Sequence, residues 1–139
     1  MVKCNIEEGK NMKVIEVSAA IIIKDNKIFV TKRGYGEFKG MWEFPGGKLE
    51  KGETGEDCIV REIKEELDAD IVVDKYLSTI DYDYPNFHLT MHNYICHLKY
   101  DHIILKEHED AKFVDIKELD SVDFLPADIL VVNDLKKEL

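Results

Sequence analysis

Residues 47–67 read GKLEKGETGEDCIVREIKEEL, and this stretch carries most of the information in the chain. Thr54, followed three residues later by Asp57, resembles a capping box and predicts a helix that runs to about Leu67. Apolar residues recur along it at about 100° per residue. We therefore expect one core-facing stripe, formed by Ile59, Val60, Ile63 and Leu67.

Three glutamates of this helix, Glu62, Glu65 and Glu66, are related as i, i+3 and i+4 and share one face beside the stripe. Like charges at this spacing destabilise a helix by a few tenths of a kcal/mol per pair, and Arg61, four residues before Glu65, offsets part of that. One interpretation is a solvated acidic face. The other is a magnesium site, because Mg²⁺ binds a few carboxylates and completes its shell with water and substrate phosphates.

The segments on either side of this stretch predict a single α/β domain. Residues 1–12 are polar and aperiodic, and are interpreted as a flexible lead-in to a domain spanning residues 13–139. A second amphipathic helix begins near residue 126 and carries Ile129, Leu130, Val132 and Leu135. Helices at two separate points among strands favour a sheet covered on both faces. The predicted strands are residues 14–23, 27–31, 42–44, 70–84, 88–100 and 111–114.

Composition narrows the possible functions. The 139 residues include 19 Lys and Arg against 29 Asp and Glu, a net charge of −10, which disfavours nucleic-acid polymers and anionic membranes as partners. A 45% apolar content argues against a disordered acidic chain. The sequence has no apolar run of membrane-spanning length and no signal-peptide pattern, and its three cysteines are widely spaced. We therefore expect a cytoplasmic protein with free thiols, whose oligomeric state the sequence leaves open.

The spacing of the central stretch is similar to a known motif. Gly47 is followed after five residues by Glu53 and after seven more by Arg61-Glu62-Ile63-Lys64-Glu65-Glu66. This resembles the Nudix box, G-x5-E-x7-R-E-U-x-E-E-x-G-U, where U is a bulky aliphatic residue. The chain departs from it at Asp68 and Ala69, where the motif has glycine and an aliphatic residue. Because aspartate tolerates the left-handed conformation at a helix end, the departure affects the loop more than the chemistry.

The resemblance extends along the chain and is greatest to the MutT branch, which includes 8-oxo-dGTP pyrophosphatases and CTP or 5-methyl-dCTP pyrophosphohydrolases. It implies an α/β/α sandwich around a mixed sheet. It also implies Mg²⁺-dependent hydrolysis of a nucleoside triphosphate to monophosphate and pyrophosphate, with Mn²⁺ as a substitute. Hydrolysis of ADP-ribose or of an RNA 5′ end, and a non-catalytic nucleotide sensor, are the alternatives. The matching segments outside the motif are residues 16–22, Arg33, residues 42–47 and residues 125–128.

The same resemblance assigns roles to the catalytic and metal-binding residues. It implies that Arg61 orients the glutamates and that Glu53 supports Arg61 from the preceding loop. Either Glu62 or Glu107 takes the proton from the attacking water, and the sequence does not decide between them. The implied metal ligands are the carbonyl of Gly46 and the side chains of Glu62, Glu65, Glu66 and Glu107.

Five further residues are candidates for binding the nucleotide substrate. Arg33 and Lys48 are candidates for contacts with phosphate or base, and the resemblance places Phe44, Phe87 and Asp128 at the base. An ionised Asp128 accepts hydrogen bonds only, which suits an exocyclic amine, whereas a protonated one can face a carbonyl. Asp128 could instead cap the last helix. The choice between 8-oxoguanine and a cytosine-type base stays open.

Overall fold

The computed structural model describes residues 12–106 and 108–139. Within them, a seven-stranded sheet has the order β3-β2-β1-β6-β5, with β4 paired to β1 and β7 paired to β2. The pair β1–β6 is parallel and the other strand pairs are antiparallel, so the sheet is mixed as predicted. The elements are β1 (Lys13–Lys24), β2 (Lys27–Lys32), β3 (Trp42–Glu43), β4 (Gly46–Lys48), α1 (Gly55–Leu67), β5 (Ile71–Tyr84), β6 (Phe87–Leu98), β7 (Asp110–Asp115), the 3-10 helix η2 (Ile116–Ser121) and α2 (Pro126–Glu138).

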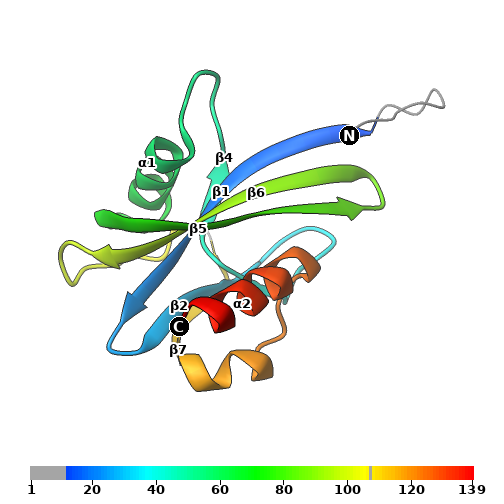
Figure 1. Ribbon diagram of the computed structural model, residues 1–139. Helices are drawn as coiled ribbons and strands as arrows, with labels where there is room; N and C mark the ends of the chain where they lie inside the picture. The colour runs from blue at the N-terminus through cyan, green and yellow to red at the C-terminus, as the bar shows by residue number, and fades with distance from the viewer. Residues whose placement is uncertain (1–11, 107) are drawn as a thin grey trace.

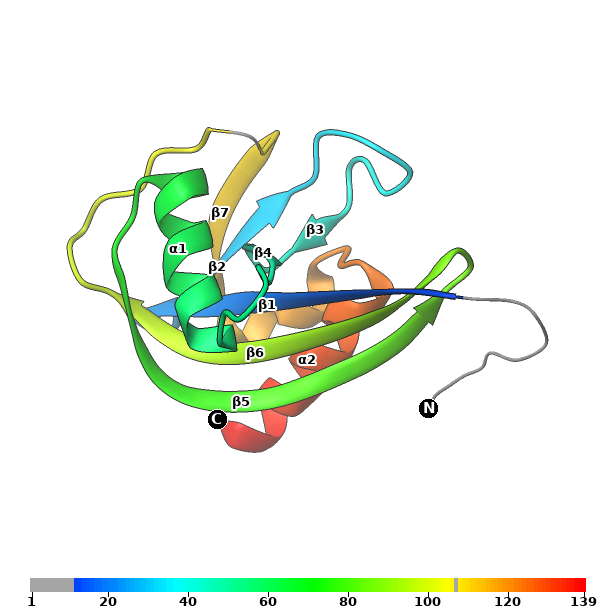
Figure 2. The same ribbon diagram turned by 90° about the horizontal axis from the view of Figure 1, so that it is seen from above.

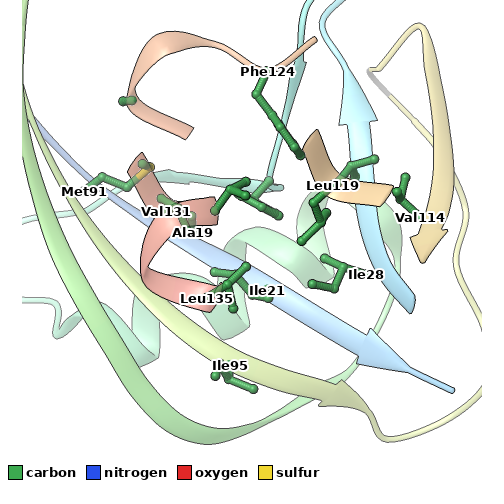
Figure 3. Close-up of a cluster of buried hydrophobic side chains, with 14 of the residues drawn as sticks. Ala19, Ile21, Ile28, Met91, Ile95, Val114, Leu119, Phe124, Val131 and Leu135 are labelled. Carbon is green, nitrogen blue, oxygen red and sulfur yellow. The ribbon is translucent and has the colours of Figure 1, made fainter. Parts of the chain in front are cut away.

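The two helices cover opposite faces of the sheet, which Figures 1 and 2 show from two directions. Successive side chains of a strand point to opposite faces, so β1 supplies both cores. Ala20 and Ile22 pack with the buried residues of α1. Ala19 and Ile21 pack instead with α2, and Figure 3 shows this second cluster around Val131 and Leu135. The sandwich predicted from the sequence is therefore confirmed.

Helix α1 begins and ends as the sequence predicts. The Thr54 hydroxyl accepts a hydrogen bond from the Asp57 N–H at 3.1 Å. At the other end Asp68 adopts the left-handed conformation, with φ of 52°, and its N–H donates to the Lys64 carbonyl at 3.1 Å. Asp68 therefore ends the helix as the glycine of the motif would.

The predicted apolar stripes include two residues, Val60 and Ile129, that are exposed instead of buried. Val60 is 42% exposed because it lies at the edge of the buried arc of α1, which is formed by Cys58, Ile59, Ile63 and Leu67. Ile129 is 49% exposed, because the buried face of α2 follows the four-residue spacing of Ala127, Val131 and Leu135. In the described part of the chain, no helix is long and apolar enough to cross a membrane.

The β5–β6 hairpin carries a histidine between two carboxylates. His88 Nδ1 lies 2.6 Å from Asp83 Oδ1, and His88 Nε2 lies 3.0 Å from Asp81 Oδ1. The hydrogen bond with Asp83, followed by that with Asp81, raises the pKa of His88. A raised folded-state pKa gives stability that is complete below the unfolded pKa of about 6.5 and is lost as pH rises through the folded value.

We expect His88→Asn to lower the free energy of unfolding at pH 6 by about 0.5–1 kcal/mol, the range for a partly exposed ion pair. The difference from the unsubstituted protein should be smaller at pH 9, because the stability that comes from a raised pKa is lost as pH rises. Urea unfolding at the two pH values measures it. His97→Asn, at a more exposed histidine that also contacts an aspartate, is the control. An equal loss at both pH values would contradict the ionic origin.

Candidate active site

A cavity of about 490 Å³ opens between β4, the start of α2 and the loop that joins β2 to β3. It brings together eight of the predicted site residues, which are Arg33, Phe44, Gly46, Lys48, Glu62, Glu66, Phe87 and Asp128. Glu65 and Arg61 lie next to this cavity on α1 but do not line it. Glu107 lies outside the described residues. The structure thus places these eight residues around one cavity.

Glu62 and Glu66 reach the cavity because α1 packs behind β4. Strand β4 pairs with β1 so that Gly47 lies opposite Ser18 and Gly46 lies opposite Ala19. The Glu62 carboxylate lies directly against Gly47, where a Cβ atom would stand 2.2 Å from Glu62 Cδ. The glycine of the motif therefore leaves the space that this carboxylate fills.

Arg61 connects the glutamates to the loop before the helix. Its Nε donates to Glu53 Oε2 at 2.7 Å and its Nη2 donates to Glu53 Oε1 at 2.9 Å, a bidentate pair. Its Nη1 donates to Glu62 Oε2 at 3.0 Å and to Glu65 Oε1 at 3.2 Å. The hydrogen bond from Arg61 lowers the pKa of Glu53 to about 2. One guanidinium thus offsets the mutual repulsion of three carboxylates.

The oxygen atoms of the glutamates on α1 suit a hard divalent cation. Glu62 and Glu66 are one helical turn apart, mostly buried, and both line the cavity beside Gly46. Glu65 is more exposed and is held by Arg61. Among residues 12–106 and 108–139, no three His, Cys, Asp or Glu side chains stand close enough together to bind one metal ion. Carboxylate and carbonyl oxygens are nevertheless the donor set that Mg²⁺ prefers, and the space beside Gly47 keeps one carboxylate on the cavity wall.

Asp128 lines the cavity from the first turn of α2, which lies on the other face of the sheet from α1. Only 5% of its surface is exposed, and its Oδ2 accepts a hydrogen bond from the Phe44 N–H at 3.0 Å. Burial raises the pKa of this carboxyl to about 8. The N-cap of α2 is Leu125, whose side chain makes no capping hydrogen bond, and Asp128 lies within the first turn.

The other predicted substrate residues divide into two groups. Arg33 forms a bidentate pair with Glu43, at 3.1 Å from Nε and 2.7 Å from Nη2, and both side chains line the cavity. Lys48 is exposed at the cavity rim. Phe44 and Phe87 present ring surface to the cavity, but each also stacks on an aromatic neighbour, Phe44 on Phe124 and Phe87 on Tyr84, both at centroid distances of 5.0 Å.

The cavity wall also includes residues that were not predicted as site residues from the sequence, among them Glu43, Tyr84, His108 and Tyr35. Glu43 pairs with Arg33 across two strands, a contact that no local pattern signals. Tyr84 accepts a hydrogen bond from the Ala127 N–H at 3.1 Å and stacks on Phe87. His108 Nε2 lies 3.8 Å from Glu66 Oε1. Tyr35 lies in the loop after β2.

Asp128 gives the stability of the protein a definite pH dependence. With a raised folded-state pKa, the folded protein holds a proton that the unfolded chain releases near pH 4, so this group makes stability fall as pH rises from about 4 to about 8. We expect Asp128→Asn to remove that decline and to make the protein more stable than the unsubstituted one at pH 8.5, by about 1–3 kcal/mol. Denaturant midpoints at pH 5 and pH 8.5 measure the change. An unchanged pH dependence would contradict it.

Comparison with known proteins agrees with this geometry. The profile of the NUDIX domain family matches residues 14–134. The chain is 30% identical over 128 residues to an 8-oxo-dGTP diphosphatase of Escherichia coli K12, covering 91% of this chain and 99% of the relative. It is 34% identical over 121 residues to a CTP pyrophosphohydrolase of the same strain, covering 85% and 88%. The solution structure of the DNA mismatch repair protein MutT from methicillin-resistant Staphylococcus aureus 252 superposes with a TM-score of 0.73 at 38% identity, over 93% of this chain and all of that one.

Proposed function

The chain belongs to the Nudix family, and we propose that it is a MutT-like hydrolase that splits a nucleoside triphosphate into the monophosphate and pyrophosphate. The observation that carries the proposal is that two chemically different groups of residues line one cavity. Glu62 and Glu66 form an acidic group beside Gly46, and Asp128 and Arg33 line the same cavity from α2 and from the loop after β2. A ligand with a polyphosphate at one end and a base at the other matches this arrangement, provided that a cation neutralises the acidic group.

We propose Mg²⁺ as the cation, with Mn²⁺ as a substitute, held by Glu62, Glu65, Glu66, the carbonyl of Gly46 and Glu107. When bound, the ion neutralises phosphate oxygens and makes a nearby water easier to deprotonate. Arg61 keeps the carboxylates oriented through its hydrogen bonds to Glu62 and Glu65. Glu53 in turn fixes the guanidinium plane.

The chemical step that this arrangement supports is attack of water on phosphorus. The water oxygen forms a new bond to phosphorus, and the anhydride bond between the α- and β-phosphates breaks. The proton of the water passes to a carboxylate, Glu62 or Glu107. Such a reaction needs positioning and charge neutralisation more than covalent help from the protein, which is what a set of fixed carboxylates supplies.

The substrates named for the two Escherichia coli relatives, 8-oxo-dGTP and CTP, both suit the Asp128 carboxyl. Burial keeps the Asp128 carboxyl largely protonated at neutral pH, so it can donate to a base carbonyl through its O–H and accept from an exocyclic amine through its other oxygen. We propose that the chain acts on one or both types. Such a role in clearing unwanted nucleotides favours a small-molecule substrate and a cytoplasmic location.

Turnover of a nucleotide panel tests this function. We expect release of pyrophosphate from one or more of dCTP, 5-methyl-dCTP, CTP, dGTP and 8-oxo-dGTP with Mg²⁺, and none with excess EDTA. ADP-ribose and RNA with a 5′-triphosphate are included as substrates of the alternative hydrolases. Release of ribose phosphate from ADP-ribose, with no triphosphate in the panel cleaved, would contradict the proposal.

A further inference from the structure

The loop between β2 and β3 carries two aromatic side chains over the cavity. Backbone hydrogen bonds close the loop at its base, from Arg33 N to the Met41 carbonyl at 2.9 Å and from Gly40 N to the Arg33 carbonyl at 2.8 Å. Both Tyr35 and Phe38 line the cavity. The loop therefore holds its aromatic side chains in a defined place on the cavity wall.

The two rings have different surroundings. Phe38 packs on Tyr84 with a centroid distance of 5.3 Å and joins the core beneath the loop. Tyr35 is 66% exposed, and its ring faces the Arg33 guanidinium, whose central carbon lies 5.7 Å from the ring centroid. A single exposed tyrosine is common on protein surfaces. Tyr35 differs because its exposed ring forms part of a cavity wall.

The contacts of Arg33 show which part of a ligand would meet this ring. Arg33 pairs with Glu43, and the residue after Glu43, Phe44, donates its N–H to Asp128. Tyr35 is therefore connected through side-chain and backbone contacts to Asp128, the candidate base-binding carboxyl. A nucleotide whose base is held at Asp128 would lie in the same cavity that the Tyr35 ring lines.

We propose that Tyr35 is a substrate-binding residue that stacks on the face of the bound base. The inference rests on the proposed function and deepens it. Every nucleobase has a π face, so stacking tolerates different bases, while hydrogen bonds at the edge discriminate between them. Tyr35 thus supplies affinity for any base, and Asp128 supplies the choice among bases.

The substitution Tyr35→Ala tests this role. We expect KM to rise about ten-fold for each nucleotide that is turned over, the size of one ordinary base stack, with kcat within about two-fold of the unsubstituted protein. Tyr35→Phe and Tyr35→Trp should keep KM close to the original value, because both retain a ring. Tyr100→Ala is the matched control, since Tyr100 is 61% exposed and also lies near a cation, Lys99, but is not part of the cavity wall.

Equilibrium binding of 8-oxo-dGMP and dCMP provides a readout that is independent of turnover. Stacking should lower the ultraviolet absorbance of the bound base, and Tyr35→Ala should lose this signal along with about ten-fold in affinity. Unchanged KM and Kd in Tyr35→Ala would overturn the inference, and so would equal losses in Tyr35→Phe and Tyr35→Ala. If the protein cleaves no triphosphate, the proposed function is contradicted. The binding of monophosphates by Tyr35→Ala still tests whether Tyr35 stacks on the base.

Discussion

Replacing Glu66 by glutamine should lower kcat by about 10³-fold while the protein stays folded. The substitution keeps the shape of the side chain but removes the negative charge from the acidic group of the cavity wall, where Glu66 lies one helical turn from Glu62. The loss of one group that acts on the developing charge of a reaction typically costs 10²–10³-fold, and a directly bound cation raises the effect towards the upper value. Initial rates at saturating nucleotide and Mg²⁺ measure kcat.

Two further measurements distinguish a loss of metal binding in Glu66→Gln from a loss of folding. Mn²⁺ binding without nucleotide should weaken in Glu66→Gln, because a carboxylate oxygen is replaced by a weaker amide donor. Thermal stability should stay the same or rise slightly, since one like-charge pair on α1 is removed. The control Glu56→Gln changes an exposed glutamate of the same helix and should preserve both turnover and Mn²⁺ binding. Full turnover in folded Glu66→Gln would contradict the assignment of Glu66 to the active site.

The sequence predicted the parts of the site that depend on local spacing. The helix cap at Thr54, the left-handed end at Asp68 and the contacts of Arg61 with its neighbours all occur within one loop and one helix. Their geometry follows from the helical repeat alone, because residues three and four apart share a face. The two helices at separate points among the strands likewise predicted a sheet covered on both faces.

Local spacing did not distinguish among the three glutamates. Periodicity places Glu62, Glu65 and Glu66 on one face, but the turn of the helix against β4 directs two of them into the cavity and leaves Glu65 with Arg61. The same limit applies to Val60 at the edge of the buried arc. A helical period gives the direction of each side chain but not the width of the surface that the neighbouring strands cover.

The resemblance named the residues that would bind the base, but their contacts could not be predicted from the sequence. These contacts join residues that are far apart in the chain, such as Asp128 with Phe44 and Tyr84 with Ala127. No local pattern encodes such pairs, because they form only when α2 packs on the sheet. This packing buries the Asp128 carboxyl and brings it to the Phe44 N–H.

Replacing Gly47 by alanine should reduce kcat by about 100-fold with little effect on folding. The added Cβ would stand 2.2 Å from Glu62 Cδ and 2.3 Å from Glu62 Oε1, so the carboxylate must move away. A misplacement of about 1 Å at a reacting group can cost 10²-fold. Because the displaced atoms are the end of a flexible side chain, we expect the free energy of unfolding to change by about 1 kcal/mol or less. Initial rates and urea unfolding measure the two effects.

Two comparisons separate a displaced carboxylate from a damaged fold. A Cβ on Gly46 would stand 2.0 Å from the Ser18 carbonyl oxygen, which belongs to the backbone of β1 and cannot turn aside, so Gly46→Ala should destabilise the fold strongly. In a Glu62→Gln background, Gly47→Ala should add little further loss, because both changes act on the same carboxylate. If folded Gly47→Ala kept more than about a third of the original kcat, or if the two losses simply multiplied, the Glu62 carboxylate would not act from the position beside Gly47.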